Sequence, residues 1–250
     1  MRSVPLSLTL LLGAALACAG CSATVGDDGA DVGTDQALTN GQATADHPEV
    51  GRVELTASAL GDTNRTHCTG TLVSPTVVVT TRGCAFGALL ASGGTFFIDK
   101  GDVVYRFAIK YGDGLTHSGT GNNSRRGTYY LVKLATPVPA KLATPSVLRK
   151  TKVDDNENLI AVGYGQASTG WGRKNSAAFS YHFDGWKGTG PTVMQSADMG
   201  CAAFDARGQL AAMGASPFSD SNLFGHPDAY IEMSEYYEQV VQLIAAMSAE

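Results

Sequence analysis

Residues 68–84 of the 250-residue chain read Cys-Thr-Gly-Thr-Leu-Val-Ser-Pro-Thr-Val-Val-Val-Thr-Thr-Arg-Gly-Cys. The run Thr71–Thr81 within this stretch consists mostly of Val, Leu and Thr, residues that favour β-strands. Runs of strand length recur between clusters of Gly, Pro, Asn and Asp, and their spacing predicts an all-β fold. The other predicted strands are Val53–Leu60, Thr95–Ile98, Val103–Lys110, Tyr129–Leu134, Leu159–Tyr164, Ala177–Phe183, Gln209–Gly214 and Ala229–Met233.

One helix is predicted after the last of these strands. Ser234 has the side chain of an N-cap, and Glu235 and Glu238 favour a first helical turn. Apolar residues then follow at three- and four-residue spacing, which is the period of a helix face. They are Tyr237, Val240, Val241, Ile244 and Ala245. Residues 45–250 suffice for one β domain, since such domains run to about 200–250 residues.

The first twenty residues, Met1–Gly20, have the pattern of a secretory signal peptide. Arg2 supplies the positive charge, Leu6–Leu16 is a short apolar core, and small residues follow up to Cys21. A transmembrane anchor is the alternative, but crossing a bilayer takes about 20 apolar residues, and this run is shorter. We therefore expect residues 1–20 to be removed on export.

The ending Ala19-Gly20-Cys21 resembles a bacterial lipobox, although Cys18 stands where leucine is usual. The resemblance implies that Cys21 is lipidated and that the protein is anchored at the cell envelope. Ser22 after the cysteine is typical of outer-membrane sorting in Gram-negative bacteria. Ser22–Thr44 contains no aromatic residue and too little apolar surface to fold, so residues 21–37 are assigned to a flexible acidic tether. A plain secreted protein is the alternative.

The cysteine count agrees with export. Of five cysteines, Cys18 leaves with the signal and Cys21 would carry lipid, so Cys68, Cys84 and Cys201 remain in the folded part, residues 38–250. Exported domains can hold disulfides, and one pair plus one thiol fits this count.

The charge balance limits the partners that the protein can bind. Once Arg2 is removed, 17 basic and 23 acidic side chains remain, a net charge of −6. A mildly acidic surface argues against nucleic acid as a partner and against electrostatic binding to membranes. No pair spaced like metal ligands and no phosphate-binding glycine loop is present in the sequence, so no cofactor is predicted.

The stretch from Cys68 to Cys84 resembles the block of trypsin-like serine proteases that ends in Thr-Ala-Ala-His-Cys. Looser likenesses extend this match over nearly all of residues 38–246. The resemblance implies two packed antiparallel Greek-key β-barrels with a C-terminal α-helix, and a disulfide between Cys68 and Cys84. The looser segments are Asn40-Gly41, His47–Gly51, Val162–Gly165 and Tyr230–Val241.

Carried onto this sequence, the family's catalytic positions hold residues that cannot act as a triad. Gly83 stands in place of the histidine, Thr128 in place of the aspartate and Met199 in place of the serine. The family's chemistry needs a hydroxyl nucleophile, an imidazole base and a carboxylate that orients the imidazole. The resemblance therefore implies a protein that has lost proteolysis.

Neighbouring positions agree with this loss. Ala197 replaces the first glycine of the serine block, whose N–H helps to bind the oxyanion, and Val193 at the specificity pocket would not select Lys or Arg. Asp198 is retained, although no Arg or Lys precedes Leu38 in the tether, so the family's activating cleavage is not expected. We expect local backbone N–H groups to satisfy the Asp198 carboxylate, because an unpaired buried charge is costly.

A relocated site is the competing reading. His67, His117 and His182 are the candidate bases, with Ser196 and Cys201 as candidate nucleophiles beside Met199. A cysteine in place of a small buried residue is more often an inert packed thiol.

Two functional hypotheses follow. In the first, the protein is an inactive trypsin-like module that binds an unknown protein or peptide at the envelope, with the lipid as its sole membrane contact. In the second, it is an endopeptidase-like hydrolase that acts through displaced residues.

Overall fold

The structure is a computed structural model, and it describes residues 38, 41–59, 62–85, 91–115, 129–167, 170–183, 188–190, 198–216 and 228–250. These residues belong to one compact unit, Gly33–Glu250. The predicted signal peptide, the lipidation at Cys21 and the tether lie outside the described residues and stay predictions. No helix in the described ranges is long and apolar enough to cross a membrane.

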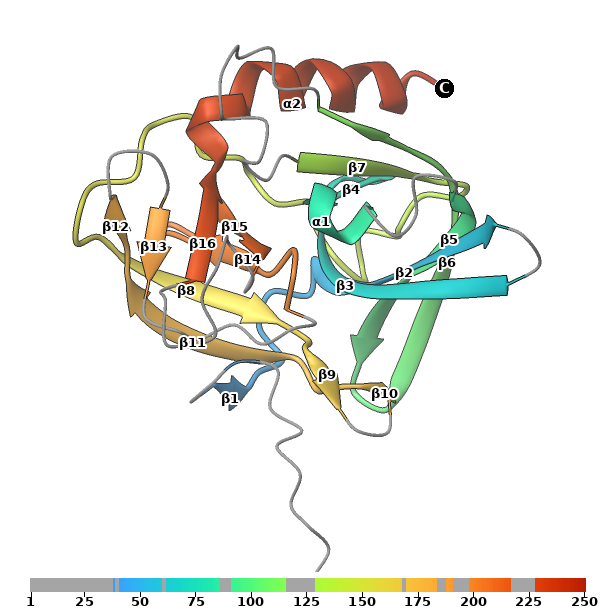
Figure 1. Cartoon of the computed structure of the whole chain (residues 1–250), viewed down its shortest axis with the longest axis horizontal. Helices are drawn as coiled ribbons and strands as arrows, with labels where there is room; N and C mark the ends of the chain where they lie inside the picture. The colour runs from blue at the N-terminus through green and yellow to red at the C-terminus, as the bar shows by residue number, and fades with distance from the viewer. Residues whose placement is uncertain are drawn as a thin grey trace, which may run out of the picture. The chain divides into compact units, whose positions relative to one another are not determined.

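The first half is a closed antiparallel barrel of six strands in the order β2-β3-β4-β7-β6-β5 (Figure 1). Every second side chain points inward, as the period of a strand requires, and these side chains form an apolar core. The strands are β2 (Val50–Ala59), β3 (Asp62–Ser74), β4 (Val77–Thr81), β5 (Ala91–Lys100), β6 (Val103–Gly114) and β7 (Tyr129–Leu134).

The predicted strand Thr71–Thr81 is two strands rather than one. Ser74 ends β3, a turn at Pro75 and Thr76 follows, and Val77 begins β4. Proline has no N–H for a sheet ladder, so the chain reverses there and Thr71 pairs with Val79. A helical turn, α1 (Arg82–Ala85), follows β4.

The second half is an eight-stranded sheet in the order β1-β11-β8-β14-β15-β16-β13-β12. Only Tyr181 separates β11 from β12 in the chain, yet these strands stand second and last in the sheet. The sheet therefore curls back until β12, at one end, follows directly on β11 at Tyr181, whose side chain is fully buried. Its strands are β1 (Gln42–Ala43), β8 (Asn158–Gly163), β11 (Asn175–Ser180), β12 (His182–Phe183), β13 (Gly188–Gly190), β14 (Ala202–Phe204), β15 (Leu210–Ser216) and β16 (Asp228–Glu232), and β9 (Gln166–Ala167) and β10 (Gly170–Trp171) form a separate ribbon.

Besides the core of the barrel, an apolar cluster lies between the barrel and the second half. Strand β4 is buried at all five positions, because Val78 faces the barrel interior while Val77 and Val79 face the second sheet. This double burial explains why the sequence has three valines in a row there instead of alternating apolar and polar residues. The interior of the second half forms its own cluster around Leu159, Phe179 and other apolar side chains.

Helix α2 (Met233–Ser248) continues from β16 and reaches back to the barrel (Figure 1). Lys133 of β7, almost fully buried, donates hydrogen bonds to the carbonyl oxygen of Met247 and, at 3.1 Å, to Thr76 Oγ1. A cation at the last carbonyl groups of a helix satisfies them and complements the helix dipole. The helix therefore ties the two halves together.

The predicted N-cap at Ser234 is wrong by two residues. Glu232 is the N-cap residue, in an extended conformation, and the helix begins at Met233. The carboxylate of Glu232 accepts hydrogen bonds from Tyr181 Oη at 2.6 Å and from Ser234 Oγ at 2.8 Å. These buried contacts fix the end of β16, so the helix starts directly after it. With this correction, the all-β class, the barrel and the C-terminal helix are confirmed.

Gly200 offers a test of how closely the two halves approach each other. It has φ +82°, and a Cβ atom placed on it would lie 2.1 Å from the carbonyl oxygen of Thr69. Gly208 has a similar φ of +74°, but apart from its two chain neighbours no atom of the described residues lies within 4 Å of its Cβ position. We expect Gly208→Ala to cost about 1–2 kcal/mol, for the left-handed conformation alone, and Gly200→Ala at least about 3 kcal/mol, because a clash adds to it. Urea unfolding of both variants measures the difference, and equal losses would contradict the close approach.

Candidate functional site

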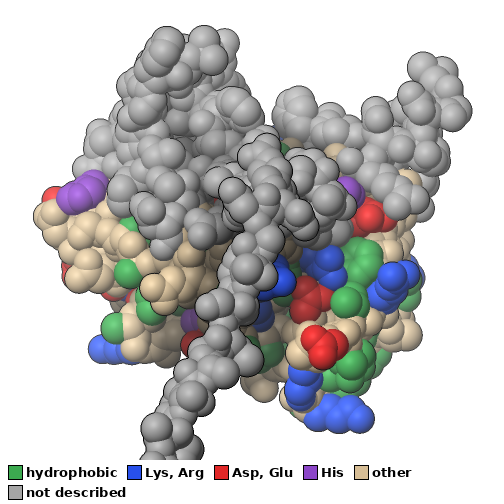
Figure 2. Space-filling model, turned by 90° about the horizontal axis from the view of Figure 1, so that it is seen from below, with side chains coloured by type: hydrophobic (Ala, Val, Ile, Leu, Met, Phe, Trp, Pro, Cys, Tyr) green, Lys and Arg blue, Asp and Glu red, His purple; other side chains and the backbone are tan. Residues whose placement is uncertain are grey.

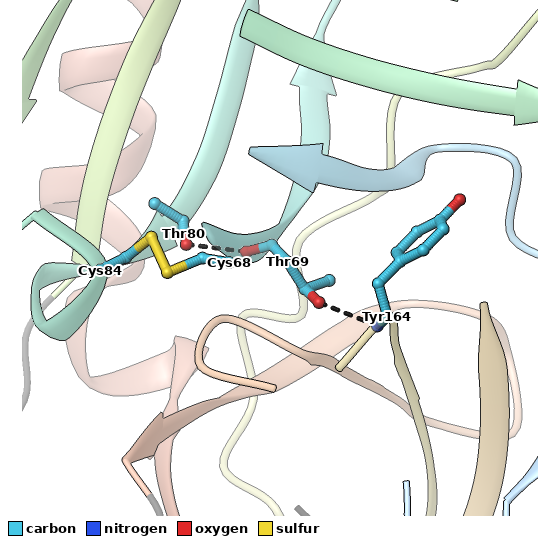
Figure 3. The surroundings of a disulfide bond; sticks show 5 residues. All are labelled: Cys68, Thr69, Thr80, Cys84 and Tyr164. Carbon is cyan, nitrogen blue, oxygen red and sulfur yellow. Dashed lines mark hydrogen bonds between the residues drawn. A yellow bond between two sulfur atoms is a disulfide. The ribbon is translucent and has the colours of Figure 1, made fainter. Parts of the chain in front are cut away.

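The disulfide predicted from the resemblance is present. Cys68 in β3 is bonded to Cys84 in α1, with their Cα atoms 6.0 Å apart, and both side chains are fully buried (Figure 3). The bond holds the α1 turn, and with it Gly83, against β3. On the chain-entropy model, closing a loop of this length stabilises the fold by about 3 kcal/mol.

The α1 turn brings Gly83 next to Met199, a residue 116 positions further along the chain. A Cβ atom placed on Gly83 would lie 3.2 Å from Met199 Sδ and 3.1 Å from the carbonyl oxygen of Ala215. Met199 is half-buried and packs against the barrel core that contains the disulfide. The two positions aligned with a histidine and a serine are therefore neighbours, and the methionine thioether fills the space that a side chain at position 83 would need.

Backbone hydrogen bonds hold the turn that carries Met199. The N–H of Thr69 donates to the carbonyl oxygen of Met199 at 3.0 Å, and the N–H of Gly200 donates to that of Gly214 at 2.8 Å. The N–H of Cys201 closes the turn on the carbonyl oxygen of Asp198, also at 2.8 Å. The turn is thus attached to β3 on one side and β15 on the other, so Met199 has a defined place.

Thr69 joins this turn to both halves. Its carbonyl oxygen accepts a hydrogen bond from Thr80 Oγ1 at 2.8 Å, and its own Oγ1 accepts one from the N–H of Tyr164 at 3.1 Å (Figure 3). Tyr164 follows β8 and is fully buried; burial raises the pKa of its hydroxyl. A neutral, buried tyrosine of this kind is a packing element rather than an acid or base.

The third aligned position, Thr128, lies outside the described residues. Tyr129, the next residue, begins β7 and pairs with Thr81, two residues before Gly83. Its hydroxyl donates to the carbonyl oxygen of Ile231 at 2.7 Å, and burial raises its pKa well above the usual value. Ala197, Val193, Ser196 and His117 also lie outside the described residues.

Asp198 and Cys201 are completely buried beside β8. A Cβ atom placed on Gly163 would lie 2.9 Å from Cys201 Cβ and 3.1 Å from Asp198 Oδ1, so glycine makes room for both side chains. A thiol without exposed surface does not meet a substrate, which is the packed role expected for Cys201. That local backbone N–H groups satisfy Asp198 stays a prediction.

The described candidate bases lie beside carboxylates. His67 Nε2 is 3.6 Å from Glu54 Oε2, on neighbouring strands of the barrel. His182 Nδ1 is 3.5 Å from Asp155 Oδ1, and both of these side chains are largely exposed. Such pairs orient an imidazole but supply no nucleophile. The described residues contain no group of three His, Cys, Asp or Glu side chains arranged as metal ligands.

An ionic cluster around Glu49 was not predicted from the sequence. His47 Nδ1 lies 3.0 Å from Glu49 Oε1, and Ser146 Oγ donates to the same oxygen at 3.3 Å. Burial acts to raise the pKa of Glu49, but hydrogen bonds from His47, its own backbone and Ser146 outweigh it and lower the pKa. The His47 ring is stacked on Phe204, with centroids 3.9 Å apart, so the cluster fastens the segment before β2 to the second sheet. The two-residue spacing of His47 and Glu49 was its only sequence signal.

The sequence matches no protein-family model and no curated protein. Solved structures do match. The crystal structure of a scabies mite inactivated protease paralogue, S-D1, is similar with a TM-score of 0.64 and 15% identity over 83% of this chain and 97% of that one. HL collagenase is similar with a TM-score of 0.63 and 16% identity, over 82% of this chain and 98% of the collagenase. GrC is similar with a TM-score of 0.62 and 13% identity, over 82% of this chain and 99% of GrC. The chain therefore has the fold of trypsin-like serine proteases.

A double-mutant cycle tests the contact between positions 83 and 199. We expect Gly83→His and Met199→Ala each to lower the free energy of unfolding, because the first crowds the thioether and the second removes packing from the disulfide core. The double variant should lose about 1 kcal/mol less free energy of unfolding than the sum of the two single losses, since the smaller side chain at position 199 leaves room for the imidazole. Gly83→His with Met247→Ala, in a different core cluster, is the control and should be additive. An additive Gly83–Met199 pair would mean that the two side chains do not compete.

Proposed function

We propose that the protein is a proteolytically inactive trypsin-like protein that works by binding, exported and held at the bacterial envelope by a lipid on Cys21. The observation that carries the proposal is the contact between Gly83 and Met199. At the place where a base and a nucleophile would have to meet, there is a glycine without a side chain and a thioether without a proton. A thioether cannot attack a carbonyl as an alkoxide does, and Gly83, the described residue at the position of the base, has no side chain to accept a proton.

The residual rates of proteases without a triad favour inactivity over slow turnover for this protein. Proteases stripped of their triad keep about 10³–10⁴-fold acceleration through the oxyanion site and substrate binding. Here the sequence puts Ala197 at a position that is glycine in that site, and a thioether at the position of the nucleophile. Residual proteolysis would then lie below what triad deletions leave.

The fold itself does not decide between activity and inactivity. An inactivated protease paralogue and a collagenase resemble this chain equally well, at 15% and 16% identity. What favours the inactive reading is the chemistry of the residues at positions 83 and 199. The alternative, a hydrolase with displaced residues, would need a nucleophile near His67, His117 or His182. His67 and His182 each lie beside a carboxylate, and His117 lies outside the described residues.

Activity-based labelling tests this proposal. We expect the purified mature protein to stay unlabelled by a fluorophosphonate probe under conditions in which trypsin is labelled completely. Met199→Ser is the matched variant, and it should also stay unlabelled, because Gly83 offers no imidazole to activate the new hydroxyl. Covalent labelling of the wild-type protein at any residue, located by mass spectrometry, would reject the inactive reading in favour of the hydrolase.

Lipidation has its own test. In a Gram-negative host supplied with an alkyne-tagged fatty acid, we expect the full chain to incorporate the tag and to fractionate with membranes. Cys21→Ser should abolish both, because this thiol is the proposed acylation site, whereas Cys18→Ser should leave both intact. Incorporation that survives Cys21→Ser would show that the anchor lies elsewhere.

A further inference from the structure

An arginine–phenylalanine–arginine row crosses the outer face of the barrel. Phe97 of β5 is paired with Arg52 of β2 on one side and with Arg106 of β6 on the other. The flanking residues Phe96, Ile98 and Phe107 point into the barrel, so alternation turns the row outward. The guanidinium carbons of Arg52 and Arg106 lie 5.2 Å and 5.6 Å from the centroid of the Phe97 ring.

The two arginines differ in how their charge is used. Arg52 forms a 2.7 Å salt bridge with Asp99, lies over the Tyr164 ring as well, and its side chain is only 14% exposed. Arg106 is exposed, and within the described ranges it forms no salt bridge. Arg52 and Asp99 therefore neutralise each other and support the ring, while Arg106 keeps a full positive charge at the surface.

The neighbours of Arg106 on its strand are apolar and exposed. Val104, two residues before it, is 44% exposed, and Ala108, two residues after it, is exposed too. Where described residues are visible in Figure 2, basic, acidic and hydrophobic side chains stand side by side.

The stretch of β6 around Arg106 is hydrogen-bonded to β5, whereas β7 pairs with β6 only from Ile109 onward. The side chains that point outward from this stretch are the groups through which we expect recognition. A guanidinium already resting on an aromatic ring loses little freedom when it binds, and its planar N–H fork fits a carboxylate at two points.

The geometry points to a docking surface for an acidic segment of a partner protein, formed by Arg106 with Phe97, Val104 and Ala108. A carboxylate of the partner sits on the outward edge of the Arg106 guanidinium, and apolar side chains two residues to either side cover Val104 and Ala108. The partner segment is extended, since only an extended chain repeats its contacts every two residues, as β6 does. The inference rests on the proposed binding function and names the class of its partner.

A labelled peptide of the matching pattern tests this surface. The probe is fluorescein-Val-Ser-Glu-Ser-Val-Ser-Glu-Ser-Val, titrated by anisotropy with the mature protein, with lysine replacing glutamate in a control peptide. We expect the glutamate peptide to bind, and Arg106→Gln to weaken it at least about tenfold, as loss of a charge-assisted contact at an interface does. Arg207→Gln removes another exposed arginine, outside the barrel, and should change the affinity less than about twofold. Thermal melts confirm that both variants are folded.

Several results would overturn the inference: no binding of the glutamate peptide, equal binding of the lysine peptide, or equal losses in the two arginine variants. So would Arg106-dependent binding to phosphatidylglycerol vesicles in place of the peptide. Failure of the proposed function looks different, because it gives fluorophosphonate labelling whether or not the peptide binds. A protein that resists labelling and ignores the peptide would keep its proposed function and lose this surface.

Discussion

The close contact between the Met199–Gly200 turn and Thr69 is the constraint on which the rest of the structure depends. The N–H, the carbonyl oxygen and the side chain of Thr69 each take part in a hydrogen bond, to the turn, to β4 and to the segment after β8. Thr69 follows directly on Cys68, so the disulfide and this junction reinforce each other. A Cβ atom on Gly200 would clash with the carbonyl oxygen of Thr69, so the two backbones are close together here. That junction fixes where position 199 stands relative to position 83.

The position of Met199 is set by its backbone and not by its side chain. The bonds that place Met199 are made by backbone groups, so they do not depend on which side chain position 199 carries. If the proposed function is right, a thioether in place of a nucleophile leaves this framework intact and packs against the disulfide core. The stability of the fold and the ability to catalyse would then be separable, because backbone atoms provide the first and side chains the second.

How much the sequence could predict follows from how local each signal is. Parts of most barrel strands, the disulfide and the C-terminal helix were predictable, since alternation, a family block and helical spacing are all legible within short stretches. Most of β3, from Asp62 to Gly70, was not predicted as a strand. The turn at Pro75 was missed because apolar residues continue on both sides of it. The helix start at Met233 was missed because it depends on Tyr181, far away in the chain. The neighbours of Arg106 needed the register of three strands, which no single stretch of sequence contains.

The buried Lys133 links a barrel strand to a helix that is synthesised much later. Its hydrogen-bond acceptor in α2 is made 114 residues later, and until then the ammonium group of β7 has no helix end to neutralise. The barrel strands, although complete by residue 134, would hold a cation on a face that later becomes apolar contact. Domains often fold as the chain emerges, but the hydrogen bond from Lys133 to Met247 can form only after α2 has been made. The proposed export of the chain before it is completely folded would fit this order.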